Sequence, residues 1–269
     1  MRRLISFDLK AEMGFFKKPD INDKIYLSYN TLHKPALLGI LGAIAGLGGY
    51  RGNSDAKKAR FPEYYERLKH LPVGVEPLGS EKGNFAKTNI SYNNTTGFAS
   101  MEAGGNLIVN EQTLLNPAFR VYLLLDDGEE LEARLYESVK NQWAEFLPYM
   151  GKNDFSVWWD KDEVREYEGA APFAFDRKFR VRTLFRKTEA VTPYIAKAVA
   201  FGFMNFEANR EMPFTYFERL PCGFDERLCQ YEMDDFVLSN AEFDEQMPRD
   251  EAHLFYSLEP DANELVQLC

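Results

Sequence analysis

Apolar and polar residues alternate at the start of the chain. Ile5, Phe7 and Leu9 take every second position, and this period of two predicts a β-strand over residues 3–9. A charged loop is expected over residues 10–23, and residues 24–29 predict a short strand or extended segment. The chain is therefore expected to begin with β structure.

The next segment, residues 35–47, is apolar on all sides of the helix that it predicts. Pro35 suits a first helical position, where the missing N–H costs little, and Gly48 with Gly49 are expected to end the helix. A membrane span needs about 20 apolar residues, and this run is shorter, so we expect a buried core helix. The spacing of three glycines indicates close packing against another element: Gly39, Gly42 and Gly46.

Five further elements are predicted up to residue 160. They are a short amphipathic helix over 61–71, a protruding polar β-arm over about 79–117, a strand over 118–125, a helix over 131–143 and a strand over 155–159. The order β, helix, arm, β, helix, β predicts an α+β fold. We expect a ferredoxin-like βαββαβ domain over residues 1–160, with the arm inserted in its middle.

Residues 161–269 are expected to form a smaller, mainly β C-terminal region. Three pieces predict an antiparallel sheet, and one segment predicts a helix: the pieces are 177–187, 213–220 and 228–238, and the helix covers 189–206.

Charge is unevenly distributed along the chain. The net charge is −10, yet residues 1–60 carry 11 Lys and Arg against 5 Asp and Glu. This contrast predicts a local site for a polyanion on a protein that otherwise repels polyanions. Three cysteines without regular spacing and the lack of a signal peptide favour a cytoplasmic protein with no membrane association. No zinc, nucleotide-loop or cofactor motif is present, so we expect no metal and no cofactor.

The basic segment and the arm supply the candidate polyanion contacts. Lysines and an arginine would contact phosphates, aromatic rings would stack on unpaired bases, and amides of the arm would bind splayed nucleotides. The phosphate candidates are Lys17, Lys18, Lys24, Lys34 and Arg51, joined by Asn22; the aromatic candidates are Phe15, Phe16, Tyr26 and Tyr29; the arm candidates are Lys82, Lys87, Asn89, Tyr92, Asn93 and Asn94.

Two other groups of residues have more than one interpretation. A second basic cluster over residues 177–187 would extend an RNA groove, dock an acidic partner or form a solvated strand; it contains Arg177, Lys178, Arg180, Arg182, Arg186 and Lys187. Separately, Tyr29, His33 and Lys34 include the residue types that a metal-independent ribonuclease uses as acid, base and cation. Binding or structure is nevertheless the preferred interpretation of that triplet.

Four segments carry a resemblance to a known family: FDLKAEMGFFKKPDINDKIYLSYNTLHKPALLGILGAIAGL at the N-terminus, Leu115-Asn116-Pro117 before the predicted strand, PYMGKNDF over 148–155, and KTNISYNNTTGF in the arm. They resemble the fifth CRISPR-associated (Cas) family, the RAMP subunit that holds the 5′ handle of the guide RNA in type I Cascade complexes. The arm is similar to the thumb of the type I-B branch. The resemblance covers residues 3–160 well and the remainder loosely.

The resemblance implies a subunit that caps the Cascade filament. Its implied partners are the crRNA 5′ handle, the backbone subunit, the large subunit and target DNA near the PAM. Most branches do not cut RNA, whereas one processes pre-crRNA with a tyrosine, a lysine and a histidine. No adjacent Lys-His pair lies in the arm or sheet where that branch would need it, and the only His-Lys pair, His33-Lys34, lies in the early loop. The glycine-rich loop of RAMP nucleases is also not evident, because Pro221-Cys222-Gly223 carries a single glycine. We therefore expect a non-catalytic RNA-binding subunit. The alternatives are a metal-independent endoribonuclease and a scaffold that binds only proteins.

Overall fold

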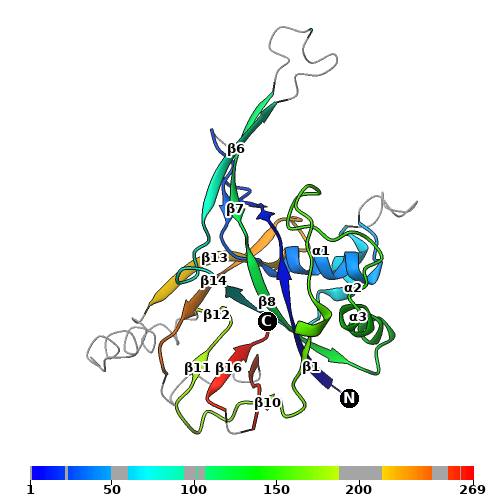
Figure 1. The fold of residues 1–269 in the computed structure, drawn as a ribbon, viewed down its shortest axis with the longest axis vertical. Coiled ribbons are helices and arrows are strands. Elements are labelled where there is room, and N and C mark those ends of the chain that lie inside the picture. The colour runs from blue at the N-terminus through cyan, green and yellow to red at the C-terminus, as the bar shows by residue number, and fades with distance from the viewer. Residues whose placement is uncertain are drawn as a thin grey trace.

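The computed structural model describes residues 2–21, 24–49, 60–93, 101, 107–187, 214–243, 254–260 and 262–269. It is a mixed α+β structure with more strand than helix (Figure 1). The α+β class predicted from the sequence is confirmed. The helix predicted over 189–206 lies outside the described residues.

The main sheet has four antiparallel strands in the order β5-β8-β1-β9. Their bounds are β1 Arg2–Lys10, β5 Val73–Leu78, β8 Ala118–Asp126 and β9 Arg165–Glu166. β1 and β8 pair along their whole length, from Arg2 opposite Asp126 to Lys10 opposite Ala118. The strands predicted over 3–9 and 118–125 are therefore confirmed.

The strand predicted over 155–159 is wrong. Trp158 makes only an isolated bridge to Lys10 at the end of β1. The chain then turns at Asp160, whose carboxylate caps the 3-10 helix Lys161–Glu163. β9 occupies the fourth position in the sheet instead. β5 was not predicted as a separate strand because it contains Gly74 and Pro77, both unusual within strands.

Three helices accompany this sheet: α1 Lys34–Ala45, α2 Glu63–Leu68 and α3 Glu130–Lys140. α1 follows β1, and the residue that caps its C-terminus is Gly46 (φ 73°), not the pair Gly48 and Gly49 that the sequence suggested. The left-handed conformation suits glycine and lets Gly46 N–H reach the last carbonyls. The close packing predicted for the glycines is found at Gly42, where an added Cβ would lie 2.3 Å from Tyr64 Cβ of α2.

The arm is an antiparallel ribbon that projects from the body, as predicted (Figure 1). β6 (Lys87–Asn93) pairs with β7 (Ile108–Leu115), and the short β2 (Met13–Gly14) joins the base of β7. Two further short strands, β3 (Phe16–Lys17) and β4 (Ser28–Tyr29), pair with each other beside it. The segment expected over 24–29 is thus a strand only at its end.

Two small sheets form the C-terminal region. β12 (Phe185–Arg186), β14 (Tyr231–Ser239) and β13 (Thr215–Phe224) are antiparallel, in agreement with the prediction. The second sheet has the order β10-β15-β16-β11 and includes a parallel pair, β11 with β16, which the sequence did not suggest. Its strands are β10 Ala171–Pro172, β11 Arg180–Val181, β15 Phe255–Ser257 and β16 Glu264–Gln267.

Both faces of the main sheet are covered. The helices pack on the face of Ile5, Phe7 and Leu9, and this core also contains residues of the C-terminal region, such as Leu220 and Leu238. On the opposite face a smaller cluster joins the sheet to β16 and its neighbours: Leu4, Tyr122, Leu124, Leu258, Val266 and Leu268. Among the described residues no helix is both long and apolar enough to span a membrane.

Candidate nucleic-acid interface

The basic N-terminal segment is fastened to the base of the arm. Tyr26 N donates to Asn110 O at 2.8 Å, and Gln112 N donates to Tyr26 O at 2.9 Å, so this segment lies along β7. Lys18 N in turn donates to Leu27 O at 2.8 Å, which holds the β3 side of the hairpin in place. The structure therefore brings together two groups of candidates that are far apart in the sequence.

Lys17 is exposed, and its ammonium lies 3.8 Å from the centre of the Tyr26 ring. A cation over an aromatic face is stabilised by the ring quadrupole. Lys17 has no ion-pair partner within the described part of the chain. Its charge is thus positioned on the surface without being neutralised, as a phosphate contact requires.

A second group of charges lies where the arm meets β13. Lys87 Nζ donates to Asn30 Oδ1 at 2.9 Å, and Asn30 N donates to Glu218 Oε1 at 2.8 Å. Lys18 Nζ lies 3.9 Å from the same Glu218 oxygen. Lys18 is thus paired with the buried carboxylate, whereas Lys87 is held by the Asn30 amide, and two ammonium groups beside one carboxylate leave the group net positive. Burial lowers the pKa of Lys87, and the nearby Lys18 lowers it further.

Glu218 was not among the sequence candidates. It occupies β13, far along the chain from Lys18 and Lys87, and is 9% exposed. A single glutamate in an acidic C-terminal region carries no distinguishing signal. Only the tertiary fold shows that it lies beneath these lysines.

On one face of the arm, the side chains that β6 contributes are polar and, beyond the first residue, uncharged. Lys87, Asn89, Ser91 and Asn93 alternate along β6 and are exposed. The register places Gln112 opposite Asn89 and Asn110 opposite Ser91, so amides and a hydroxyl lie side by side on one face. These groups both donate and accept hydrogen bonds, which suits base edges and ribose hydroxyls. Lys82 is also exposed, in the turn before β6.

The other face of the arm is clamped to the loop after α3. Lys152 Nζ donates to Glu111 Oε2 at 2.7 Å and to Tyr92 OH at 3.0 Å, and Tyr92 OH donates to Glu111 Oε1 at 2.6 Å. Desolvation opposes the ammonium, but the bonds to Glu111 and Tyr92 outweigh it and raise the pKa of Lys152. Tyr92 remains 41% exposed, so its ring is accessible as well as fixed.

Several candidates lie elsewhere than expected. Phe15, Phe16 and Tyr29 are at most 5% exposed, and this burial does not fit the expected stacking on bases. Lys34 Nζ donates to the backbone oxygen of Cys269 at 2.8 Å, and burial lowers its pKa. We therefore leave these four residues out of the interface. Asn22, Arg51 and Asn94 lie outside the described residues.

His33 caps α1. Its Nδ1 accepts from Ala36 N at 3.3 Å, and its ring lies edge-on to Phe16, Tyr29 and Tyr231, with centroids 5.4–5.8 Å apart. Burial lowers the pKa of His33 to about 3 and contributes most to raising the pKa of Tyr29 to about 12. A general base works best with a pKa near the working pH, so this imidazole is a poor base at neutral pH.

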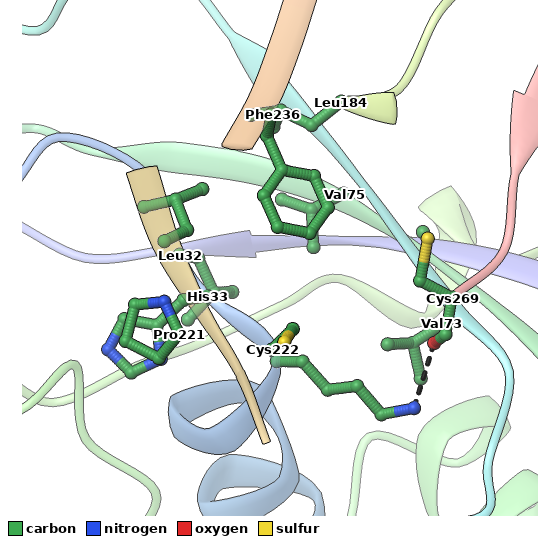
Figure 2. Close-up of a pocket in the computed structure, with 12 residues that line it drawn as sticks. Leu32, His33, Val73, Val75, Leu184, Pro221, Cys222, Phe236 and Cys269 are labelled. Atoms are coloured by element: carbon green, nitrogen blue, oxygen red, sulfur yellow. Dashed lines mark hydrogen bonds between the residues drawn. The ribbon is translucent and has the colours of Figure 1, made fainter. Parts of the chain in front are cut away.

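The three side chains of the ribonuclease alternative have different partners. Tyr29 OH points to Met233 Sδ, 3.9 Å away, whereas Lys34 reaches Cys269 (dashed line, Figure 2). His33 and Lys34 line a cavity of about 40 Å³, which is otherwise mostly apolar and has room for water only. Its lining includes Leu32, Val75, Leu184, Cys222 and Phe236 (Figure 2).

The second basic cluster is largely neutralised within the chain. Arg182 pairs with Glu76 at 3.1 Å and with Glu264 at 3.3 Å. The other ion pairs are Arg177–Asp176, Lys178–Glu242 and Arg186–Asp234, and Lys187 lies over the Phe217 ring. This pairing favours a structural role over an RNA groove. Within the described ranges no group of three His, Cys, Asp or Glu side chains is arranged to hold a metal.

Comparison with known proteins gives structural likenesses only. No family model and no curated protein matches the chain. A chain of the type III-B Cmr-beta complex bound to cognate target RNA and AMPPnP is 11% identical, with a TM-score of 0.49 over 98% of this chain and 99% of that one. A chain of a CRISPR RNA-guided surveillance complex is 13% identical, with a TM-score of 0.45 over 88% and 90%. A CRISPR protein from Archaeoglobus fulgidus is 11% identical, with a TM-score of 0.41 over 90% of each chain.

Proposed function

We propose that this chain is a non-catalytic RNA-binding subunit of a CRISPR surveillance complex and holds the crRNA 5′ handle at the base of its arm. The observation that carries the proposal is the juxtaposition of exposed lysines with the polar, uncharged side chains of β6 in an acidic chain. Phosphates would contact the lysines, and unpaired nucleotides would lie along the arm. The interface comprises Lys17, Lys18, Lys24, Lys82, Lys87, Asn89, Tyr92 and Asn93.

The finer assignment is to the fifth Cas family, in its type I-B branch. It rests on the sequence resemblance of the N-terminal segment, the arm and the PYMGKNDF motif. The strand order β5-β8-β1-β9, with α1 after β1 and α3 after β8, supports a ferredoxin-like domain. The proposed partners are the crRNA handle, the backbone and large subunits and target DNA near the PAM, in the cytoplasm.

The absence of catalysis is part of the proposal. It is supported by the engagement of His33 as a helix cap and by its burial, which leaves it neutral and weakly basic at pH 7. Tyr29 and Lys34 are bonded to separate groups and do not converge on a common point of the surface.

The test uses the complex purified from cells that make a tagged chain. We expect the double variant Lys17→Ala, Lys18→Ala to retain less crRNA, and to lower the slope of log retention against log salt by about 0.7 for each phosphate that is no longer neutralised. The matched control is Lys161→Ala, an exposed lysine outside the interface. The RNA is quantified by absorbance and identified by sequencing.

Equal retention by the double variant and the control at every salt concentration would place the RNA elsewhere. Cleavage is examined separately by incubating the chain with repeat RNA in EDTA. Specific cleavage that the conservative variant His33→Asn abolishes would contradict the non-catalytic assignment, whether or not the lysines bind the handle.

A further inference from the structure

Five large apolar side chains lie exposed on one short segment outside the proposed RNA interface. They are Trp143 (55% exposed), Phe146 (52%), Leu147 (69%), Tyr149 (44%) and Trp158 (46%). Single exposed apolar residues are ordinary, whereas several in a short segment mark an interaction site. This segment therefore has the character of an interaction site.

The segment is held firmly against the rest of the chain. Phe146 N donates to Ala43 O near the end of α1 at 3.0 Å. At the other end, Trp158 and the Lys10 backbone of β1 exchange two hydrogen bonds of 2.9 Å. Because the backbone is already fixed at both ends, little ordering entropy is lost on binding. The exposed side chains form a preformed surface.

Part of the segment is a two-stranded ribbon with one inward and one outward face. Tyr149 bridges Ser156, and Val157 N donates to Pro148 O at 3.0 Å. Pro148 and Val157 point into the core and are buried. The same register sets Leu147 opposite Trp158. We call Leu147, Tyr149 and Trp158 the apolar ribbon face.

The exposed charges in the same stretch, residues 143–162, are mostly negative. Four exposed carboxylates have no ion-pair partner among the described residues: Glu145, Asp154, Asp160 and Asp162. Of the two lysines in the same stretch, Lys152 is occupied by Glu111, which leaves only Lys161. We call these four carboxylates the acidic rim; they repel phosphate and attract cationic groups. A nucleic acid is therefore disfavoured here, although tryptophans can stack on bases.

We propose that the apolar ribbon face docks a segment of a partner protein that carries aliphatic or aromatic side chains flanked by Lys or Arg. Apolar contacts with Leu147 and Trp158 would supply the affinity, and the acidic rim would select the basic flanks. The inference rests on the proposed role as a subunit, since it names the chemistry of one neighbour. It involves none of the residues proposed to contact RNA.

The test pans a phage-displayed library of random peptides against the full chain. We expect the selected peptides to combine apolar residues with Lys or Arg and to bind the double variant Leu147→Ser, Trp158→Ser at least tenfold more weakly. The matched control is Leu228→Ser, Phe217→Ser, which removes two apolar side chains of similar exposure elsewhere. Glu145→Lys with Asp154→Lys tests the rim, and we expect it to weaken binding as well.

Peptides without basic residues, or peptides that bind both double variants equally, would overturn the proposal. So would self-association of the wild-type chain that Leu147→Ser, Trp158→Ser abolishes, because the occupant would then be a second copy. Retention of crRNA is measured on the same variants and is expected to stay unchanged. If RNA binding fails in the wild type while peptide selectivity holds, only the proposed function is overturned.

Discussion

The imidazole of His33 is 5% exposed and lies among three aromatic rings, one of which belongs to Tyr231 of β14. The sequence placed a tyrosine, a histidine and a lysine within six residues, which suggested either chemistry or binding. It could not reveal their burial, because β14 is distant in the chain. The same holds for Phe15 and Phe16, which lie beside lysines in sequence but point into the core.

The stability of the fold should decrease as the pH is lowered, because of His33. Its pKa is about 3 in the folded chain, well below the ordinary value of 6.5. Protons therefore bind preferentially to the unfolded chain. The contribution of His33 is complete above pH 6.5, and below it about 1.4 kcal/mol is lost for each pH unit until pH reaches the folded pKa.

His33→Asn keeps a side-chain acceptor for the helix cap without titrating. Urea unfolding of both proteins between about pH 7 and pH 5 should show a shallower loss of stability in the variant. Parallel loss in the two proteins would mean that another group governs the acid response.

Elements were predicted where a residue pattern is strong, although their ends differ by a few residues. The strand over 3–9, the apolar helix and the protruding arm all follow periods or compositions that adjoining residues set by themselves. β5 and β9 depend on β8 and β1 as neighbours in the sheet, so local patterns indicated them poorly. The clamp at the arm is a similar case, since Lys152 meets Glu111 only after folding.

The orientation of the arm should depend on Lys152. Lys152→Met retains the apolar stem but leaves the Glu111 carboxylate, which is 6% exposed, without its cation. We expect a cost of about 1–3 kcal/mol for the unpaired buried group. Hydrogen exchange of the β6 and β7 amides should accelerate more than that of β1.

Adding Glu111→Gln to Lys152→Met removes the stranded charge, so part of the stability should return. An exchange pattern in β6 and β7 that Lys152→Met leaves unchanged would show that the ladder and β2 fix the arm without this clamp.

At the scale of the whole molecule, residues 1–160 and 161–269 were expected as two regions. Residues of the second region nevertheless pack on both faces of the main sheet. Leu4 and Leu124 share a buried cluster with Val266 and Leu268, and Leu220 lies in the core formed with the helices. The sequence could not predict that the C-terminal region packs on the main sheet, because β16 has only four residues and shows no alternation of apolar and polar positions.

Unfolding of the two regions should therefore be coupled. All three tryptophans lie between residues 143 and 159, so their fluorescence reports on the first region. Leu268→Ala removes a fully buried side chain from the second region. It should lower the free energy of unfolding that is measured by tryptophan fluorescence by about 2–5 kcal/mol. Leu228→Ala, at an exposed position, is the control. A tryptophan transition that Leu268→Ala does not shift would establish independent regions.

The outer edge of β6 has a consequence for how the chain must be made. No strand within the described residues pairs with this edge, so a row of backbone N–H and C=O groups is open. The strand carries a single lysine and no proline, and such edges template pairing between chains, which leads to aggregation. Synthesis of this protein should therefore be matched to that of the partner that covers the arm, because excess copies with an open β6 edge would aggregate.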